Sequence, residues 1–189
     1  LERQIAFPKE VGPRIELLHT YRQAGEAVRV AREADALLRD FAGDSAALLS
    51  LADFAANVGD VALMRRIVGE AAARGMELDP FALLRVETLV VARDFQGAVE
   101  AIRGYRAEFP AGERTHAGVL DSLQAAALLG LGDDSAATMF LNSFLGQADL
   151  RADNLLAVAN RLADLGAVDA ARRTLARAVE LDPLNQAAL

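Results

Sequence analysis

Apolar residues recur along this chain at helical spacing, in segments separated by short polar turns. The segment from residue 154 to 165 is the clearest, and the apolar residues on one stripe of that helix are Leu155, Val158, Ala159 and Leu162. Residues 170 to 181 form a second segment. Asp182-Pro183 ends it, because the residue before a proline is disfavoured in the helical region. The pattern predicts helices joined in pairs by tight turns.

The turns themselves recur at nearly constant intervals. Turn-like residues stand at Gly25, Gly59, Arg93, Gly132 and Gly166, so the successive intervals are 34, 34, 39 and 34 residues. A period of this length is typical of stacked helix pairs, in which each pair packs only on its neighbours. The sequence therefore predicts an all-α fold of five antiparallel helix pairs.

The register divides the chain into a lead-in and five units. Residues 1–10 are a lead-in or the end of a preceding helix, and residues 11–189 are the repeat array, with approximate units 11–44, 45–78, 79–112, 113–151 and 152–185. The five extra residues fall near 110–116, where we expect a longer turn, or a loop particular to this protein. The chain opens without methionine and closes where another repeat would begin, so we expect a fragment of a longer protein.

The last unit resembles the tetratricopeptide repeat. The positions that carry the resemblance are Leu155, Val158, Ala159, Leu162, Gly166, Ala171, Leu175, Ala178 and Pro183. In the third unit, Ala98, Ile102 and Pro110 stand at the same offsets as Ala171, Leu175 and Pro183. The match departs from the family at Arg93, which replaces the turn glycine, and at Leu155 and Leu162, which replace aromatic residues. The resemblance implies a right-handed α-α superhelix, or solenoid, in a bacterial protein of this family.

The register also predicts which side chains are buried. Small residues let helices approach closely, and those expected at the contacts are Ala52, Ala98, Ala159, Ala171 and Ala178. We expect Leu175 on the inner face of its helix, and Ala137, Leu141 and Phe144 inward in the fourth unit. Phe140 and Phe144 beside Met139 either fill the core or form an exposed apolar patch that docks a partner.

Charge and composition narrow the functional classes. The net charge is −7 and Lys9 is the only lysine, which disfavours binding to nucleic acid or to an anionic membrane. The absence of cysteine excludes disulfides and thiolate sites. No apolar run is long enough to cross a membrane. The compartment stays open between cytoplasm and periplasm.

The sequence offers no recognisable catalytic, cofactor or metal site. His19 and His116 lie in different units, and neither has a second histidine one helical turn away. Gly130-Leu131-Gly132 occupies a turn of the repeat rather than a phosphate-binding loop. We therefore expect a protein that is not an enzyme and takes no cofactor.

In the tetratricopeptide family the first helix of each pair lines a concave groove, and the resemblance carries this role to particular positions. The groove candidates are Ile15, His19, Arg22, Leu49, Asp53, Asn57, Leu83, Glu87, Val90, Ser122, Leu129, Leu156, Asn160 and Asp164. This set is apolar, with scattered acids and one arginine. It lacks the lysines with which the family's best-known clamp holds a C-terminal carboxylate.

Three functional hypotheses follow. The first is a protein–protein interaction scaffold that grips an extended or helical partner segment, apolar with some basic residues. The second is self-association into a dimer or larger assembly, because the ends of a solenoid fragment expose apolar faces. The third is a substrate-recruiting arm of a larger enzyme, or a part of an export or sensor protein.

Overall fold

The structure, a computed structural model, describes residues 10–147 and 150–182. This part of the chain folds into ten α-helices and contains no strand, which confirms the predicted all-α class. The helices belong to two compact units, Leu1–Ala92 and Arg93–Leu189. The division falls inside the third predicted repeat, so its first helix belongs to one unit and its second helix to the other.

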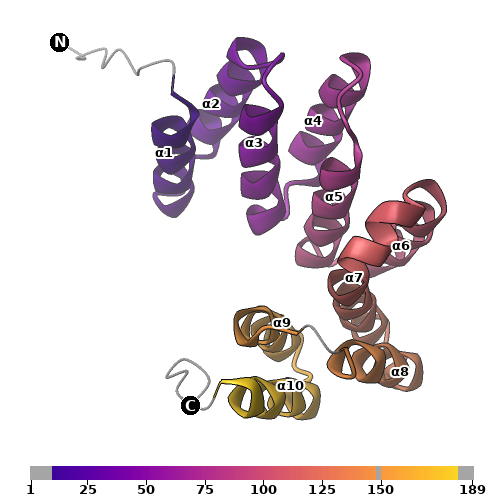
Figure 1. Ribbon diagram of the computed structural model, residues 1–189. Helices are drawn as coiled ribbons and strands as arrows, with labels where there is room; N and C mark the ends of the chain where they lie inside the picture. Colours follow the sequence, from indigo (N-terminus) through magenta and orange to yellow (C-terminus); the bar gives the residue numbers. More distant parts are fainter. Residues whose placement is uncertain (1–9, 148–149, 183–189) are drawn as a thin grey trace. The chain divides into compact units, whose positions relative to one another are not determined.

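The first unit holds five helices. They are α1 (Val11–Gln23), α2 (Ala27–Asp40), α3 (Ser45–Val58), α4 (Val61–Ala73) and α5 (Asp79–Val91). Helices α1, α3 and α5 pack against one another in series, while α2 and α4 pack against these three (Figure 1). Phe54 and Phe81 lie at the centre of the core with no exposed surface, and Met64 and Ile67 of α4 contribute to the same cluster.

The second unit holds the other five helices. They are α6 (Phe95–Glu108), α7 (Pro110–Gly130), α8 (Asp134–Leu145), α9 (Ala152–Asp164) and α10 (Val168–Leu181). Helix α7 packs against α6, α8 and α9, and α10 packs against α8 and α9. The core between α7, α8, α9 and α10 contains Leu141, Phe144, Leu155 and Leu162.

The five turn positions predicted from the spacing all adopt a left-handed backbone. Their φ angles are 72° at Gly25, 69° at Gly59, 60° at Arg93, 80° at Gly132 and 79° at Gly166. Arg93 is the only residue other than glycine with a positive φ in the part of the chain that the structure describes. The arginine therefore takes the same conformation as the glycines it replaces, and the predicted turn register is confirmed.

An aspartate follows three of these turn residues and begins the next helix. The side chains of Asp60, Asp94 and Asp133 accept hydrogen bonds from the backbone N–H three residues later, at 2.9, 3.0 and 3.1 Å. Each bond satisfies a donor that the first turn of a helix leaves without an intrahelical partner. The two-residue combination of left-handed turn and aspartate cap thus starts α4, α6 and α8.

The five extra residues near 110–116 are helical, so the expectation of a longer turn or loop there is wrong. Pro110 occupies the first turn of α7, where its fixed φ favours the helix and its missing N–H costs nothing. Helix α7 is kinked at His116, whose φ of −110° and ψ of 16° depart from helical values. The insertion therefore lengthens the first helix of the fourth pair.

Most of the predicted packing positions are buried. Ala52, Ala98, Ala159, Ala171 and Ala178 are all buried, as are Ala137, Leu141 and Phe144. The expectation for Leu175 is wrong, because this side chain is half-buried and the neighbouring Thr174 is fully buried instead. The Thr174 hydroxyl donates to the carbonyl of Ala170 at 2.9 Å, which satisfies its polar group inside the core.

The two phenylalanines of α8 differ in how deeply they are buried. Phe144 belongs to the core, while Phe140 is half-buried, and the guanidinium carbon of Arg106 lies 5.6 Å from the centroid of the Phe140 ring. Met139 is 66% exposed. Only Met139 of the three is available as a free apolar surface.

Candidate interaction surface

Three neighbouring helices carry the groove candidates of the first unit. Since α1, α3 and α5 pack in series, their candidate residues lie along one row of helices. We use the name "α1–α3–α5 face" for the candidates of this row that retain solvent exposure: Ile15, His19, Arg22, Leu49, Asp53, Asn57, Leu83 and Glu87.

The apolar part of this face is anchored on the core. Ile15 and Leu49 are half-buried and pack against the central cluster of the unit. The ring of His19 packs edge-on against Phe54, with centroids 5.0 Å apart and an interplanar angle of 76°. Contacts with the core hold these side chains in place, while part of each stays accessible to solvent. A contact surface that is ordered in this way before binding is preorganised.

The polar part of the face is acidic. Asp53 and Asn57 are exposed one turn apart on α3, and the Asn57 amide donates to the Asp53 carboxylate at 3.1 Å. Glu87 of α5 is half-buried and carries a second carboxylate, whereas Arg22 at the end of α1 is the one basic residue of the set. The formal charge of the face is therefore negative.

Two groove candidates are not on the surface. Val90 is 3% exposed and Ser122 is 2% exposed. The Ser122 hydroxyl donates to the carbonyl of Val119 at 2.7 Å, within its own helix. Both side chains contribute to packing and cannot contact a partner in this conformation.

The second unit holds the remaining candidates on α7 and α9, two helices that pack together. Leu129 and Leu156 are half-buried, whereas Asn160 and Asp164 are exposed. The backbone carbonyl of Asp164 accepts a hydrogen bond from Arg93 at 3.3 Å, which joins the end of α9 to the turn before α6. These four residues share the apolar and acidic character of the α1–α3–α5 face.

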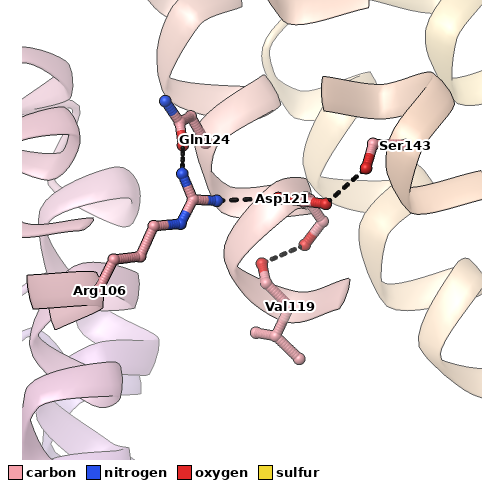
Figure 2. Close-up of polar contacts among 6 residues, drawn as sticks. Arg106, Val119, Asp121, Gln124 and Ser143 are labelled. Carbon is pink, nitrogen blue, oxygen red and sulfur yellow. Dashed lines mark hydrogen bonds and ion pairs between the residues drawn. The ribbon is translucent and has the colours of Figure 1, made fainter. Parts of the chain in front are cut away.

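A polar network that sequence reasoning missed joins three helices of the second unit. Figure 2 shows Arg106 of α6 donating to Gln124 at 2.6 Å and to Asp121 at 2.8 Å, both on α7. The other carboxylate oxygen of Asp121 accepts from Ser143 of α8 at 2.9 Å. Because the side chains of Arg106 and Asp121 are only 26% and 14% exposed, the pair is partly desolvated. The network fixes α6, α7 and α8 relative to one another.

A second missed cluster joins α1 to α2. Arg14 is 8% exposed, donates from Nε to Glu33 and forms an ion pair with Asp40 at 2.7 Å. Burial alone lowers the pKa of Arg14, but the hydrogen bonds and charges of Asp40 and Glu33 outweigh it and raise that pKa above its usual value. Arg14 is therefore a permanently charged structural link. A pattern of apolar positions could not reveal it, because Arg14 stands between Val11 and Ile15 as an ordinary polar residue.

The described residues contain no group of three or more histidine, cysteine, aspartate or glutamate side chains placed to hold a metal ion. None of the helices in that part of the chain is long and apolar enough to cross a membrane.

Comparison of the chain with protein-family models, with curated proteins and with solved structures found no match.

Proposed function

We propose that this chain is a tetratricopeptide-type array of helix pairs that binds a segment of a partner protein. Five left-handed turn residues at the spacing of helix-pair repeats support the repeat assignment. The observation that carries the binding role is the α1–α3–α5 face, on which half-exposed apolar side chains lie beside carboxylates.

The character of this face defines the partner. Ile15, Leu49 and Leu83 offer apolar contact, so the partner segment carries large apolar side chains. The exposed carboxylate of Asp53 attracts lysine or arginine and repels acids, which sets the specificity more than the affinity. The partner is an apolar segment with basic residues, bound in an extended or helical form.

Selection from a library of random dodecapeptides tests this function. We expect enrichment of peptides that combine large apolar residues with lysine or arginine. An enriched set without any peptides that combine apolar and basic residues would contradict the proposal, and so would the absence of any enrichment.

A matched pair of variants then locates the binding surface. Asp53→Arg reverses an exposed charge on the face, and Glu77→Arg makes the same change at an exposed position between α4 and α5. Asp53→Arg should weaken binding of a selected peptide about five- to tenfold, equivalent to about 1–1.4 kcal/mol. Glu77→Arg should change it less than about twofold, within the usual range for charges remote from an interface. Equal effects of the two variants would mean that the peptide responds only to net charge.

Self-association is a second candidate, and one observation favours it. Met139 of α8 and Val168 at the start of α10 are 66% and 60% exposed, and these two helices pack against each other. Sedimentation velocity should then show a concentration-dependent dimer that Met139→Glu weakens. A monomer at all concentrations would remove this candidate and leave peptide binding untouched.

A further inference from the structure

Two hollows lie between α2 and α4 of the first unit. The first has a volume of about 270 Å³, and its lining includes Ala31 of α2 and Ala62 of α4. The second has a volume of about 650 Å³, and its lining includes Arg39 of α2 and Gly69 of α4. The hollows share one residue with the α1–α3–α5 face, since Arg22 at the end of α1 belongs to that face and also borders the first hollow.

The two hollows form one groove divided by a single ion pair. Arg66 lines both of them and pairs with Asp35 across the gap, at 2.7 Å. The two side chains are 54% and 43% exposed, so the pair contributes little stability and can rearrange. Lining residues extend along α2, whose 14 residues span about 21 Å at the usual helical rise. The groove is thus as long as a helix of about four turns.

Small residues predominate in the apolar floor of the groove, together with one valine and two leucines. In the first hollow Ala27, Ala31 and Ala62 are exposed, and in the second Gly69 is exposed. Small residues at a helix contact allow a short distance between helix axes. The surface therefore suits the apolar side of an approaching helix, which would lie between α2 and α4.

The rim of the groove is basic, although the protein as a whole is acidic. Its arginines are Arg22, Arg39, Arg66 and Arg74, and its acids are Asp35, Asp60 and Glu70. Asp35 pairs with Arg66 and Glu70 pairs with Arg74, while Asp60 caps α4 and keeps its charge. Within the described residues, Arg22 and Arg39 form no ion pair. Two uncompensated arginines against one uncompensated carboxylate leave the rim with a positive formal charge.

We propose that the α2–α4 groove docks an amphipathic helix of a partner protein, with an apolar stripe on the alanine floor and carboxylates facing Arg39 and Arg66. This is helix-in-groove recognition, in which an apolar stripe gives contact and flanking charges give specificity. A carboxylate of the partner can take the place of Asp35 on Arg66. The groove thus prefers the charge opposite to that preferred by the α1–α3–α5 face, so one chain can hold two different partner segments.

The test uses two synthetic 16-residue helical peptides with the same leucine stripe, flanked in one by glutamate and in the other by lysine. Fluorescence anisotropy with the full chain at low salt should give a Kd of about 100 µM or tighter for the glutamate peptide. The lysine peptide, measured with the Asp53→Arg variant to weaken its binding to the α1–α3–α5 face, should bind at least about tenfold more weakly than the glutamate peptide. No measurable binding of the glutamate peptide would overturn the proposal, as would equal affinity of this variant for both peptides.

Variants locate the binding of the glutamate peptide. The double variant Ala31→Gln with Ala62→Gln fills the floor at two exposed helical positions, and Ala72→Gln is the matched control on α4 outside both hollows. We expect the double variant to weaken the glutamate peptide at least about fivefold and the control less than about twofold. Asp53→Arg should not weaken it. If Ala72→Gln weakens binding as much as the double variant, the peptide binds elsewhere and the groove assignment is wrong.

Discussion

Two glycine-to-alanine substitutions in the second unit should have opposite effects on stability. Gly166 joins α9 to α10 with a φ of +79°, and a methyl group added there would meet no atom within 4 Å. Gly104 lies inside α6, where an added methyl group also has open space. Since neither substitution creates a clash, the backbone conformation alone decides whether the free energy of unfolding rises or falls.

The magnitudes follow from that difference. A left-handed backbone costs an alanine about 1–2 kcal/mol, partly offset because alanine restricts the unfolded chain more than glycine does. Gly166→Ala should therefore lower the free energy of unfolding by about 1 kcal/mol. Gly104→Ala should raise it by about 0.5–1 kcal/mol, because alanine favours a helix interior.

Urea denaturation followed by far-ultraviolet circular dichroism measures both changes, with the m-value compared between variants to check that the transition is unchanged. The two midpoints should move in opposite directions from that of the parent chain. If Gly166→Ala stabilises the protein as Gly104→Ala does, residue 166 is not a left-handed turn, and the repeat register fails at its clearest unit.

Three further predictions concern stability and are measured by the same denaturation. Gly59→Ala should lower the free energy of unfolding more than Gly166→Ala does, because the added methyl group would also lie 3.0 Å from a backbone nitrogen just after α5. Equal losses of stability would refute that close approach. Leu162→Ala should lower the free energy of unfolding by about 2–5 kcal/mol, since Leu162 has no exposed surface. This loss should clearly exceed that of Leu175→Ala at a half-buried position, and the reverse order would refute the packing of the last helix pair. Arg14→Met should cost about 1–3 kcal/mol by leaving two carboxylates without their partner, and an unchanged midpoint would contradict a structural role for that cluster.

The sequence predicted the turns well because their cause is local. A tight connection between two helices requires a left-handed residue, and glycine takes that conformation without strain. Arg93 lacks this chemical signal, yet the interval of 34 residues placed a turn there, and its φ of 60° agrees. The periodicity thus predicted a left-handed backbone at Arg93, which the residue type alone would not have predicted.

The wrong predictions concern features that depend on how neighbouring helices pack. Thr174 and Leu175 differ by about 100° around α10, and only the packing of α8 and α9 determines which of them is buried. Likewise, the extra residues from Pro110 onward have the length of a loop but fold as the first turns of α7.

The polar clusters could not be predicted for a related reason. Arg106 and Asp121 are 15 residues apart and lie on different helices, so no local spacing relates them. They meet only because α6 packs against α7. The α2–α4 groove is a similar case, since its lining joins two helices that belong to different repeats.

Amide hydrogen exchange of the chain, with and without an apolar and basic peptide from the dodecapeptide selection, tests the central claim most directly. The account predicts that the peptide slows exchange in α1, α3 and α5, whose packed row carries the apolar and acidic side chains. Protection confined to α8 and α10, or to α2 and α4, would contradict the assignment of the α1–α3–α5 face as the site that binds a partner segment.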